Sequence, residues 1–335
     1  MTENLFRRNV WHNLSGSHLS ADTSSAGLIA NTREVNDTIV DTMRTSLTAG
    51  YSALFRNGNT GYFFNNLNYK AWGDDVTRNA QVFFYDTGAR ILGADNNLAY
   101  TPDRTLSYMD PWTSQVTPLT DVNPQFVAVA SDNFTLQAGS GARGKAGALT
   151  QTSGVGSGTT FSVVSGGGGF FRGPNSNIAQ YGGKLTEGDV ITIGTDTRTV
   201  ASVSGDRITV TSPFTWADGE PVYYGSDPTP DIGAYPYNAG GYTLSASYAM
   251  AGSTATITPN DASLVRFVVC YSSGVPYAID NNSPYTCAAP AGAFSARVYP
   301  RYASKTLWVT VGAGPSVPTT PTAPSAPKNL KVTGH

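Results

Sequence analysis

Short apolar clusters followed by Asn or Asp recur through residues 4–105, and this repeat limits the possible folds more than any other feature. The clusters are spaced by roughly 20 to 28 residues, a length typical of one solenoid coil. One series lies at residues 10–14, 38–42, 62–67 and 82–86, and a second at residues 5–9, 28–31 and 54–57. Each coil is therefore expected to contain at least two short strands separated by polar turns.

The repeat predicts an all-β fold with a right-handed parallel β-helix over residues 1–149. Each coil would bury an apolar strand face against the coils above and below it. Asn side chains at the turns are expected to stack, each amide bonding to the Asn of the next coil. The alternative is a β-sandwich with Asn-rich loops, which would not need a fixed spacing. Residues 33–47 have some helical character, but the β-branched Thr38, Ile39 and Val40 favour a strand.

Composition agrees with an extracellular β protein rich in turns. Charged residues make up 13% of the chain, and Gly (36) and Pro (20) are abundant. The runs of Ala, Leu, Glu and Lys that long helices need are missing. A formal net charge of -2 gives no support for nucleic-acid binding. No apolar run is long enough to span a membrane, and the first residues do not read as a signal peptide.

Proline residues interrupt the repeat after residue 105, so a long connection is expected over residues 106–150. Residues 150–228 alternate in hydrophobicity, and the turn signal Ser204-Gly205-Asp206 joins two of the expected strands. This pattern predicts a small antiparallel β-barrel, after which residues 229–237 return to the end of the β-helix.

Two further units follow the barrel. Short strands at regular spacing over residues 238–312 are typical of a β-sandwich. Residues 313–335 form a linker rich in Pro, Ser and Thr, and then the start of another module.

Several segments resemble known families. Residues 123–142 (NPQFVAVASDNFTLQAGSGA) and 231–237 (DIGAYPY) are similar to the closing coils of secreted bacterial β-helix proteins, which read NPxF…DFxLQxGSPAxxxG and later DIGAYEY. Pro236 replaces the usual Glu, and Gly141 stands where Pro is common. The resemblance implies a secreted protein in which residues 150–228 are a barrel inserted into the end of the β-helix.

The last two units also carry family signals. Residues 265–286 (VRFVVCYSSGVPYAIDNNSPYT) resemble bacterial Ig-like modules of the VxFYVDGxxVATDTxxPYS type. Residues 324–333 look like the first strand of a fibronectin type III domain. These resemblances imply a longer protein, with further coils before this sequence and a further module after it.

The two cysteines, Cys270 and Cys287, both lie in β-like sequence. One disulfide closing a hairpin-sized loop would fit an oxidising compartment. The alternative is a pair of free thiols. A metal site is disfavoured because no His lies near them.

β-Helix enzymes act on polysaccharides along an exposed face of the solenoid. A lyase needs a base and a cation that neutralises the uronate carboxylate, whereas a hydrolase needs two carboxylic acids. The candidate catalytic residues are Arg7, Arg33, Glu34, Asp37, Lys70 and Arg78. Arg7, Arg33 and Arg56 fall near one coil apart and are predicted to form a basic stripe. The alternative is that these charges are solvated side chains on the turns.

Aromatic and acidic side chains supply the other candidates for a glycan site. Trp11, Tyr62, Tyr69 and Trp72 could stack on sugar rings, although alternation along a strand turns half of such residues toward the core. Asp74 and Asp75 form either a turn or half of a Ca²⁺ site, the one cofactor that the sequence suggests.

Three functions remain open from the sequence. The first is a polysaccharide lyase or glycoside hydrolase that acts as a monomer on an extended glycan; the resemblance implies it, because this architecture is common in secreted polysaccharide degraders. The second is a non-catalytic glycan-binding or adhesive surface protein, and the third is a structural stalk. Fold alone does not decide among them. We expect the isolated chain to be inactive even if a longer parent is an enzyme.

Overall fold

The computed structural model describes residues 4–12, 19–21, 32–40, 51–56, 60–70, 82–87, 90–102, 115–178, 183–235, 237, 244–288, 294–300 and 309–311. These residues form β-strands, turns and short 3-10 segments, so the all-β prediction is confirmed. None of the described residues belongs to a helix that could cross a membrane.

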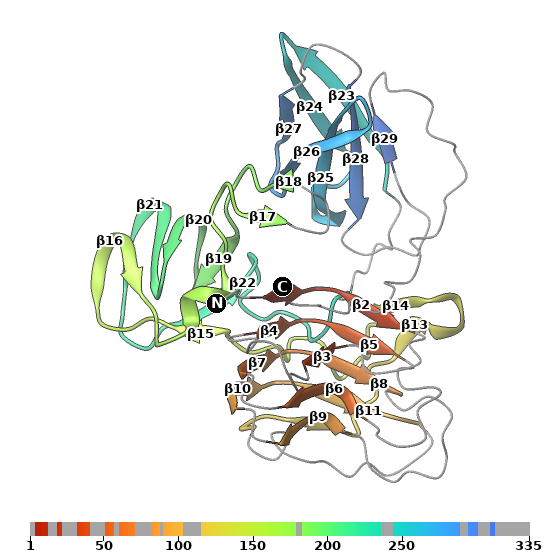
Figure 1. Ribbon diagram of the computed structural model, residues 1–335, viewed down its shortest axis with the longest axis vertical. Coiled ribbons are helices and arrows are strands. Elements are labelled where there is room, and N and C mark those ends of the chain that lie inside the picture. The colour runs from red at the N-terminus through yellow and green to blue at the C-terminus, as the bar shows by residue number, and fades with distance from the viewer. Residues whose placement is uncertain are drawn as a thin grey trace.

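Three parallel sheets build the first part of the chain (Figure 1). Sheet A contains β1 (Leu5–Arg7), β4 (Thr32–Val35), β7 (Thr60–Phe64) and β10 (Arg90–Asp95). Sheet B contains β2 (Val10–His12), β5 (Thr38–Val40), β8 (Leu67–Tyr69), β11 (Leu98–Tyr100) and β12 (Leu119–Thr120). Sheet C contains β3 (Leu19–Ala21), β6 (Tyr51–Arg56) and β9 (Val82–Thr87). The chain visits the sheets in turn, an arrangement that fits a parallel β-helix.

A ladder of hydrogen bonds runs through the turns between sheets A and B. The backbone N–H of Asn9 donates to Asp37 Oδ1 (2.7 Å), and that of Asp37 donates to Asn66 Oδ1 (2.8 Å). The ladder continues from Asn66 to Asn97 Oδ1 (2.9 Å) and from Asn97 to Gln115 Oε1 (3.2 Å). The predicted stacking of Asn side chains from coil to coil is therefore present, with an Asp at the second rung. The predicted bond from one Asn amide to the next Asn is not found between Asn66 and Asn97, because both amides donate to backbone carbonyls.

The ladder sets the coil length. Successive rungs are separated by 28, 29 and 31 residues, so the expected period of 20 to 28 was too short. The two predicted series also mixed sheets: Tyr62 pairs with Arg33 of sheet A, whereas Leu54 and Val82 belong to sheet C. The error arose because apolar clusters from different strands look alike, while the turn residues alone mark equivalent points.

The residue before each ladder position adopts a left-handed backbone, with φ of 54° at Asn36, 60° at Asn65 and 52° at Asn96. Asn tolerates this conformation better than most residues. Its side chain also binds the closing segment, since Asn65 exchanges two hydrogen bonds with the backbone of Gly147 (2.7 and 3.0 Å). In the pair Asn65-Asn66, the first side chain therefore binds the later segment at Gly147, and the second binds the backbone of the previous coil at Glu34 and Asp37.

Later segments cover the outer face of sheet B. The hairpin of β13 (Phe126–Ala128) and β14 (Asn133–Leu136) packs its Phe126, Phe134 and Leu136 against Val40, Leu67 and Leu98. Ile232 of the returning segment joins the same cluster, and the backbone N–H of Ala234 donates to Thr38 (2.8 Å).

The next unit, here called the barrel, is a six-stranded antiparallel sheet. Its order is β15 (Thr150–Gln151), β22 (Pro221–Tyr224), β19 (Val190–Ile193), β20 (Asp196–Ser204), β21 (Arg207–Trp216) and β16 (Gly156–Ser162). An antiparallel bridge between Thr152 and Val163 links the first and last strands, so the sheet closes on itself. The predicted hairpin turn at Gly205 is present between β20 and β21. A small hairpin, β17 (Asn177–Ile178) and β18 (Gly183–Lys184), projects from the barrel.

The last unit, here called the sandwich, has two antiparallel sheets. One is β23 (Ala246–Ala251), β24 (Thr254–Pro259) and β27 (Tyr285–Ala288). The other is β26 (Val275–Asp280), β25 (Val265–Ser272), β28 (Phe294–Pro300) and β29 (Val309–Val311). Their inner faces share one apolar cluster, which is the packing of a β-sandwich. The exact boundaries between the units stay predictions.

Replacing Asn66 by Ala should break the ladder. The fully buried Asn66 accepts from the N–H of Asp37 and donates to the carbonyl of Glu34 (3.0 Å), and the substitution leaves both groups buried without those bonds. We expect a loss of about 3 kcal/mol in the free energy of unfolding, measured by chemical denaturation. The exposed Asn177→Ala is the control and should change stability by less than about 0.5 kcal/mol. Equal effects of the two substitutions would contradict the role of the ladder.

Candidate functional site

The outer face of sheet A lies beneath the barrel, and Arg7 is at its centre. Its guanidinium forms a two-pronged ion pair with Asp189 (2.8 Å for each bond) and donates to the carbonyl of Phe170 (3.2 Å). It also lies 3.9 Å from the centre of the Tyr224 ring. Burial acts to lower the pKa of Arg7, but the charge of Asp189 and its hydrogen bonds raise it overall, so Arg7 stays charged.

Arg33 lies on the neighbouring rung of the same face. Its Nη2 donates to the carbonyl of Gly166 (2.8 Å), and its guanidinium lies near the rings of Tyr62 (4.9 Å) and Phe170 (5.2 Å). The run Gly166–Gly169 is wedged between these side chains and the barrel, because a Cβ at Gly166 would overlap Tyr62 Oη and one at Gly169 would overlap Arg33. Part of this run belongs to a packed 3-10 turn, Gly167–Phe170, in which Gly167 and Gly168 are buried.

The sandwich reaches the same junction from the other side. Arg266 Nη2 of β25 donates to the backbone carbonyl of Arg7 (2.7 Å). Leu185, which follows β18, forms a parallel bridge with Ile279 and packs among Phe267 and Tyr299. The N–H of Thr186 donates to the carbonyl of Ile279 (2.8 Å), so the barrel adds a short strand to the edge of the sandwich at β26.

The predicted basic stripe is wrong. Arg7 pairs with Val35, whereas Arg33 pairs with Leu5 and Tyr62, so the two arginines are offset along their strands. Arg56 belongs to β6 of sheet C, on a different face. Coils of 28 to 31 residues explain the mismatch with the assumed spacing. Arg7 and Arg33 bind the barrel, which covers this part of sheet A. A polymer therefore cannot reach these two residues.

Glu34 lies inside the coils. Its neighbours in register are Phe6 and Phe63, and side chains on either side of it along β4 contact the barrel, so alternation turns Glu34 inward. It is completely buried, as is Asp37 in the ladder.

Asp37 accepts three kinds of donor: the N–H of Asn9, the Asn9 amide (3.3 Å) and Trp11 Nε1 (3.0 Å). Burial and the nearby carboxyl of Glu34 raise the pKa of Asp37 to about 7, and the hydrogen bonds oppose part of this rise. A raised pKa is often found at functional sites. Here the cause is enclosure in the solenoid, where no described surface gives a polymer access.

The three aromatic candidates that the structure describes pack against protein groups. Trp11 contacts Phe6 edge-on, with ring centres 6.1 Å apart. Tyr62 meets Phe170 (5.4 Å), and Tyr69 lies between Tyr100 (5.9 Å) and Phe126 (5.3 Å). Each ring is partly exposed at most.

Of the remaining candidates, the structure describes Lys70. Lys70 follows β8 with a left-handed backbone (φ 49°), and its N–H donates to the carbonyl of Tyr100 in the next coil (3.0 Å). Arg78, Trp72, Asp74 and Asp75 lie outside the described residues. Among the residues that are described, no group of three or more His, Cys, Asp or Glu could hold a metal ion.

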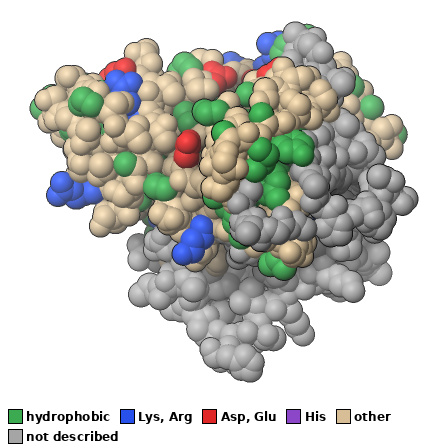
Figure 2. All heavy atoms as spheres, turned by 90° about the horizontal axis from the view of Figure 1, so that it is seen from above, with side chains coloured by type: hydrophobic (Ala, Val, Ile, Leu, Met, Phe, Trp, Pro, Cys, Tyr) green, Lys and Arg blue, Asp and Glu red, His purple; other side chains and the backbone are tan. Residues whose placement is uncertain are grey.

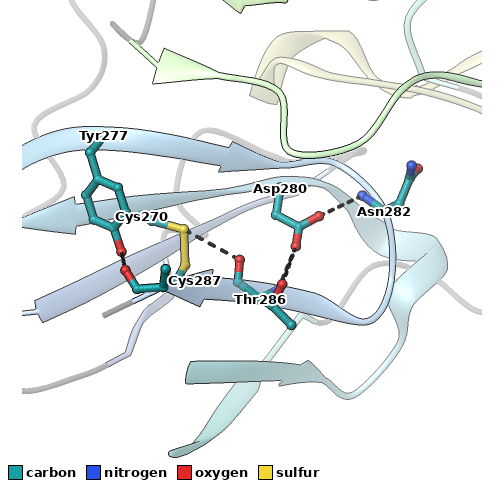
Figure 3. Close-up of a disulfide and its surroundings, with 7 residues drawn as sticks. Cys270, Tyr277, Asp280, Asn282, Thr286 and Cys287 are labelled. Carbon is teal, nitrogen blue, oxygen red and sulfur yellow. Dashed lines mark hydrogen bonds between the residues drawn. A yellow bond between two sulfur atoms is a disulfide. The ribbon is translucent and has the colours of Figure 1, made fainter. Parts of the chain in front are cut away.

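Cys270 and Cys287 form a disulfide between β25 and β27, with a Cα–Cα distance of 5.8 Å, so the predicted pairing is confirmed (Figure 3). Asp280 lies beside it and accepts hydrogen bonds from the N–H groups of Asn282 (3.2 Å) and Thr286 (2.6 Å). Burial raises the pKa of Asp280, and those bonds oppose the rise. Asn282 in turn donates to the carbonyl of Gly188 (2.9 Å), which ties this loop to the barrel.

Comparison with known proteins does not place the chain in a family: no family model, no curated protein and no solved structure matches it.

Reasoning from sequence did not find the partners of the candidate residues. Asp189, Gly166 and Arg266 are far from Arg7 and Arg33 in the chain, and no local pattern distinguishes them from surface residues. Asp189 is 1% exposed, the type of position where an acid needs a partner, but this burial is visible only in the structure.

Removing the charge of Asp189 should loosen the junction. Asp189→Asn leaves Arg7 buried without its counter-charge, so we expect the free energy of unfolding to fall by about 3 kcal/mol. The matched control is Asp196→Asn, which breaks the more exposed ion pair with Arg198 and should cost less than about 1 kcal/mol. Chemical denaturation measures both. The double variant Arg7→Met with Asp189→Asn should lose less than the sum of the single changes; strict additivity would contradict the pair.

Replacing Asp37 by Asn should change how stability depends on pH. The folded-state pKa of Asp37 is raised, so the folded protein binds more protons than the unfolded chain between about pH 4 and 7. Stability should therefore decrease as the pH rises through this window. Asp37→Asn removes that decrease and should be more stable than the wild type at pH 8, by about 1 to 3 kcal/mol.

Denaturation midpoints at pH 5 and pH 8 test this expectation. Asp280 shifts in the same direction, so the decisive quantity is the difference between the variant and the wild type at each pH. The exposed Asp121→Asn is the control and should follow the wild type. A variant that is less stable than the wild type at pH 8 would show that the carboxylate stabilises the ladder.

Proposed function

We propose that the chain is part of a secreted bacterial protein with a right-handed β-helix, and that this part binds an extended polysaccharide without cleaving it. The parallel sheets and the hydrogen-bond ladder support the β-helix. The segments at residues 123–142 and 231–237 are similar to closing coils of such proteins, and both contribute to covering sheet B. The disulfide fits an oxidising compartment.

The observation that carries the proposal is that later segments of the chain pack on two of the three solenoid faces. The barrel packs over sheet A, and residues 126–146 and 232 pack over sheet B. Figure 1 shows the barrel and the sandwich away from β6 and β9 of sheet C. We therefore propose sheet C as the face for a long ligand; Arg56 ends its strand β6 and pairs in register with Thr87 of β9.

The same geometry disfavours catalysis by the candidate residues that are described. A lyase base or a pair of hydrolase acids must touch the sugar. Glu34 and Asp37 are enclosed by the coils, and Arg7 and Arg33 hold the barrel. Binding through aromatic and polar groups requires no such acid pair.

Affinity gel electrophoresis of the full chain, in gels that contain acidic or neutral polysaccharides, tests the proposal. We expect retardation in at least one acidic gel, reduced several-fold by Arg56→Ser and unchanged by Arg207→Ser, an exposed arginine on the barrel. Parallel assays follow unsaturated uronate and new reducing ends, with Ca²⁺ and with a chelator. Turnover would show an enzyme, and absence of retardation in every gel would favour a structural stalk.

A further inference from the structure

Strand β23 is the edge of the three-stranded sheet of the sandwich, and it is exposed along nearly its whole length. Every residue from Ser247 to Ala251 is exposed, including Tyr248 (42%) and Met250 (48%). Tyr248 and Met250 pair with Ile257 and Ala255 of β24, which point into the core, so these two side chains extend the inner apolar face past the edge.

The backbone of β23 alternates between its neighbour and the open side. Asn260 donates to the carbonyl of Ser245 (2.9 Å), which places the odd-numbered residues of β23 in the hydrogen-bonded pairs with β24. The N–H and C=O groups of Ala246, Tyr248 and Met250 therefore point outward. Among the described strands, only β24 pairs with β23.

The other sheet of the sandwich has a comparable edge strand, β26, and this edge is covered. There β26 is covered by Leu185 and Thr186 of the barrel through a bridge and a backbone hydrogen bond. Natural edge strands that stay unpaired usually carry a charge, a proline or a bulge. The sequence of β23, ASYAMA, has no charge and no proline, and its register with β24 is regular.

We propose that β23 is an interaction surface for a second copy of this chain, joined antiparallel about a twofold axis at Ala249. This register places Tyr248 opposite Met250 of the other copy, and Met250 opposite its Tyr248. The backbone N–H and C=O groups of Tyr248 and Met250 point away from β24 and toward the other copy. Each Tyr248–Met250 pair therefore exchanges two backbone hydrogen bonds. On the inner face the arrangement gives two sulfur–aromatic contacts, a favourable combination.

The other face of β23 fits the same arrangement. It carries only Ser247, Ala249 and Ala251, whose small side chains meet without obstruction. Because the strand has no charge, two copies approach without repulsion. A second copy places a Met opposite Tyr248 and a Tyr opposite Met250 by symmetry alone. A strand from an unrelated protein would need the same two residues at the same spacing.

Disulfide trapping in the full chain tests the register. The two native cysteines are already bonded to each other, so Ala249→Cys introduces the one free thiol. Residues facing each other in a non-hydrogen-bonded pair have Cα atoms about 4.5 Å apart, within reach of a disulfide. Mild oxidation should give a covalent dimer at least about tenfold faster for Ala249→Cys than for Ser247→Cys. A mixture of Ser247→Cys and Ala251→Cys chains should cross-link, since these positions face each other.

Sedimentation velocity tests the association itself. Ala249→Lys and Ala249→Glu should each weaken dimerisation at least tenfold by placing like charges together, and an equal mixture of the two should restore it. Val275→Lys, at an exposed position of β26 (64%), is the control and should dimerise like the wild type. A wild-type chain that stays monomeric at millimolar concentration, or cross-linking that is equal at positions 247 and 249, would overturn the proposal.

Discussion

The hydrogen-bond ladder through the turns is the constraint on which the rest of the structure depends. Each rung side chain accepts from the backbone of the previous coil, and Asn66 and Asn97 also donate to the carbonyls of Glu34 and Phe63 (3.0 and 2.9 Å). These bonds fix where every coil restarts, and the flanking strands inherit that register. Because strand alternation turns neighbouring side chains to opposite faces, a slip by one residue would exchange the inner and outer rows.

Register in turn decides which side chains are available for function. Arg7, Val35 and Phe64 form one outward row, and Phe6, Glu34 and Phe63 form an inward one. The barrel covers the outward row, using the charge of Arg7 and the apolar Phe64 together. Charged residues that look suited to a polyanionic ligand thus serve as attachment points between units. Seen from the sandwich end, the described part of the surface carries only scattered charged side chains of either sign (Figure 2).

Local patterns predicted the elements well. Alternation identified β19 and β20, the turn signal located the hairpin at Gly205, and the β-branched run favoured a strand at β5. The disulfide was predictable because both cysteines lie on strands of one small unit. The solenoid period and the long-range partners could not be predicted from the sequence, because they depend on contacts between residues far apart in the chain. The adjacent polar residues at each turn, such as Asn65-Asn66, would have given the true period, since the first side chain binds the segment at Gly147 and the second binds the previous coil.

The short strand that the barrel adds to the sandwich has a mechanical consequence. Thr186, Gly188 and the backbone of Arg7 all hold the sandwich through bonds to Ile279, Asn282 and Arg266. Tension applied to the sandwich at β29 is therefore shared between the connecting chain and these lateral bonds, and reaches both the barrel and the first coil. Under load, the three units should resist separation together and then part at this seam before any of them unravels.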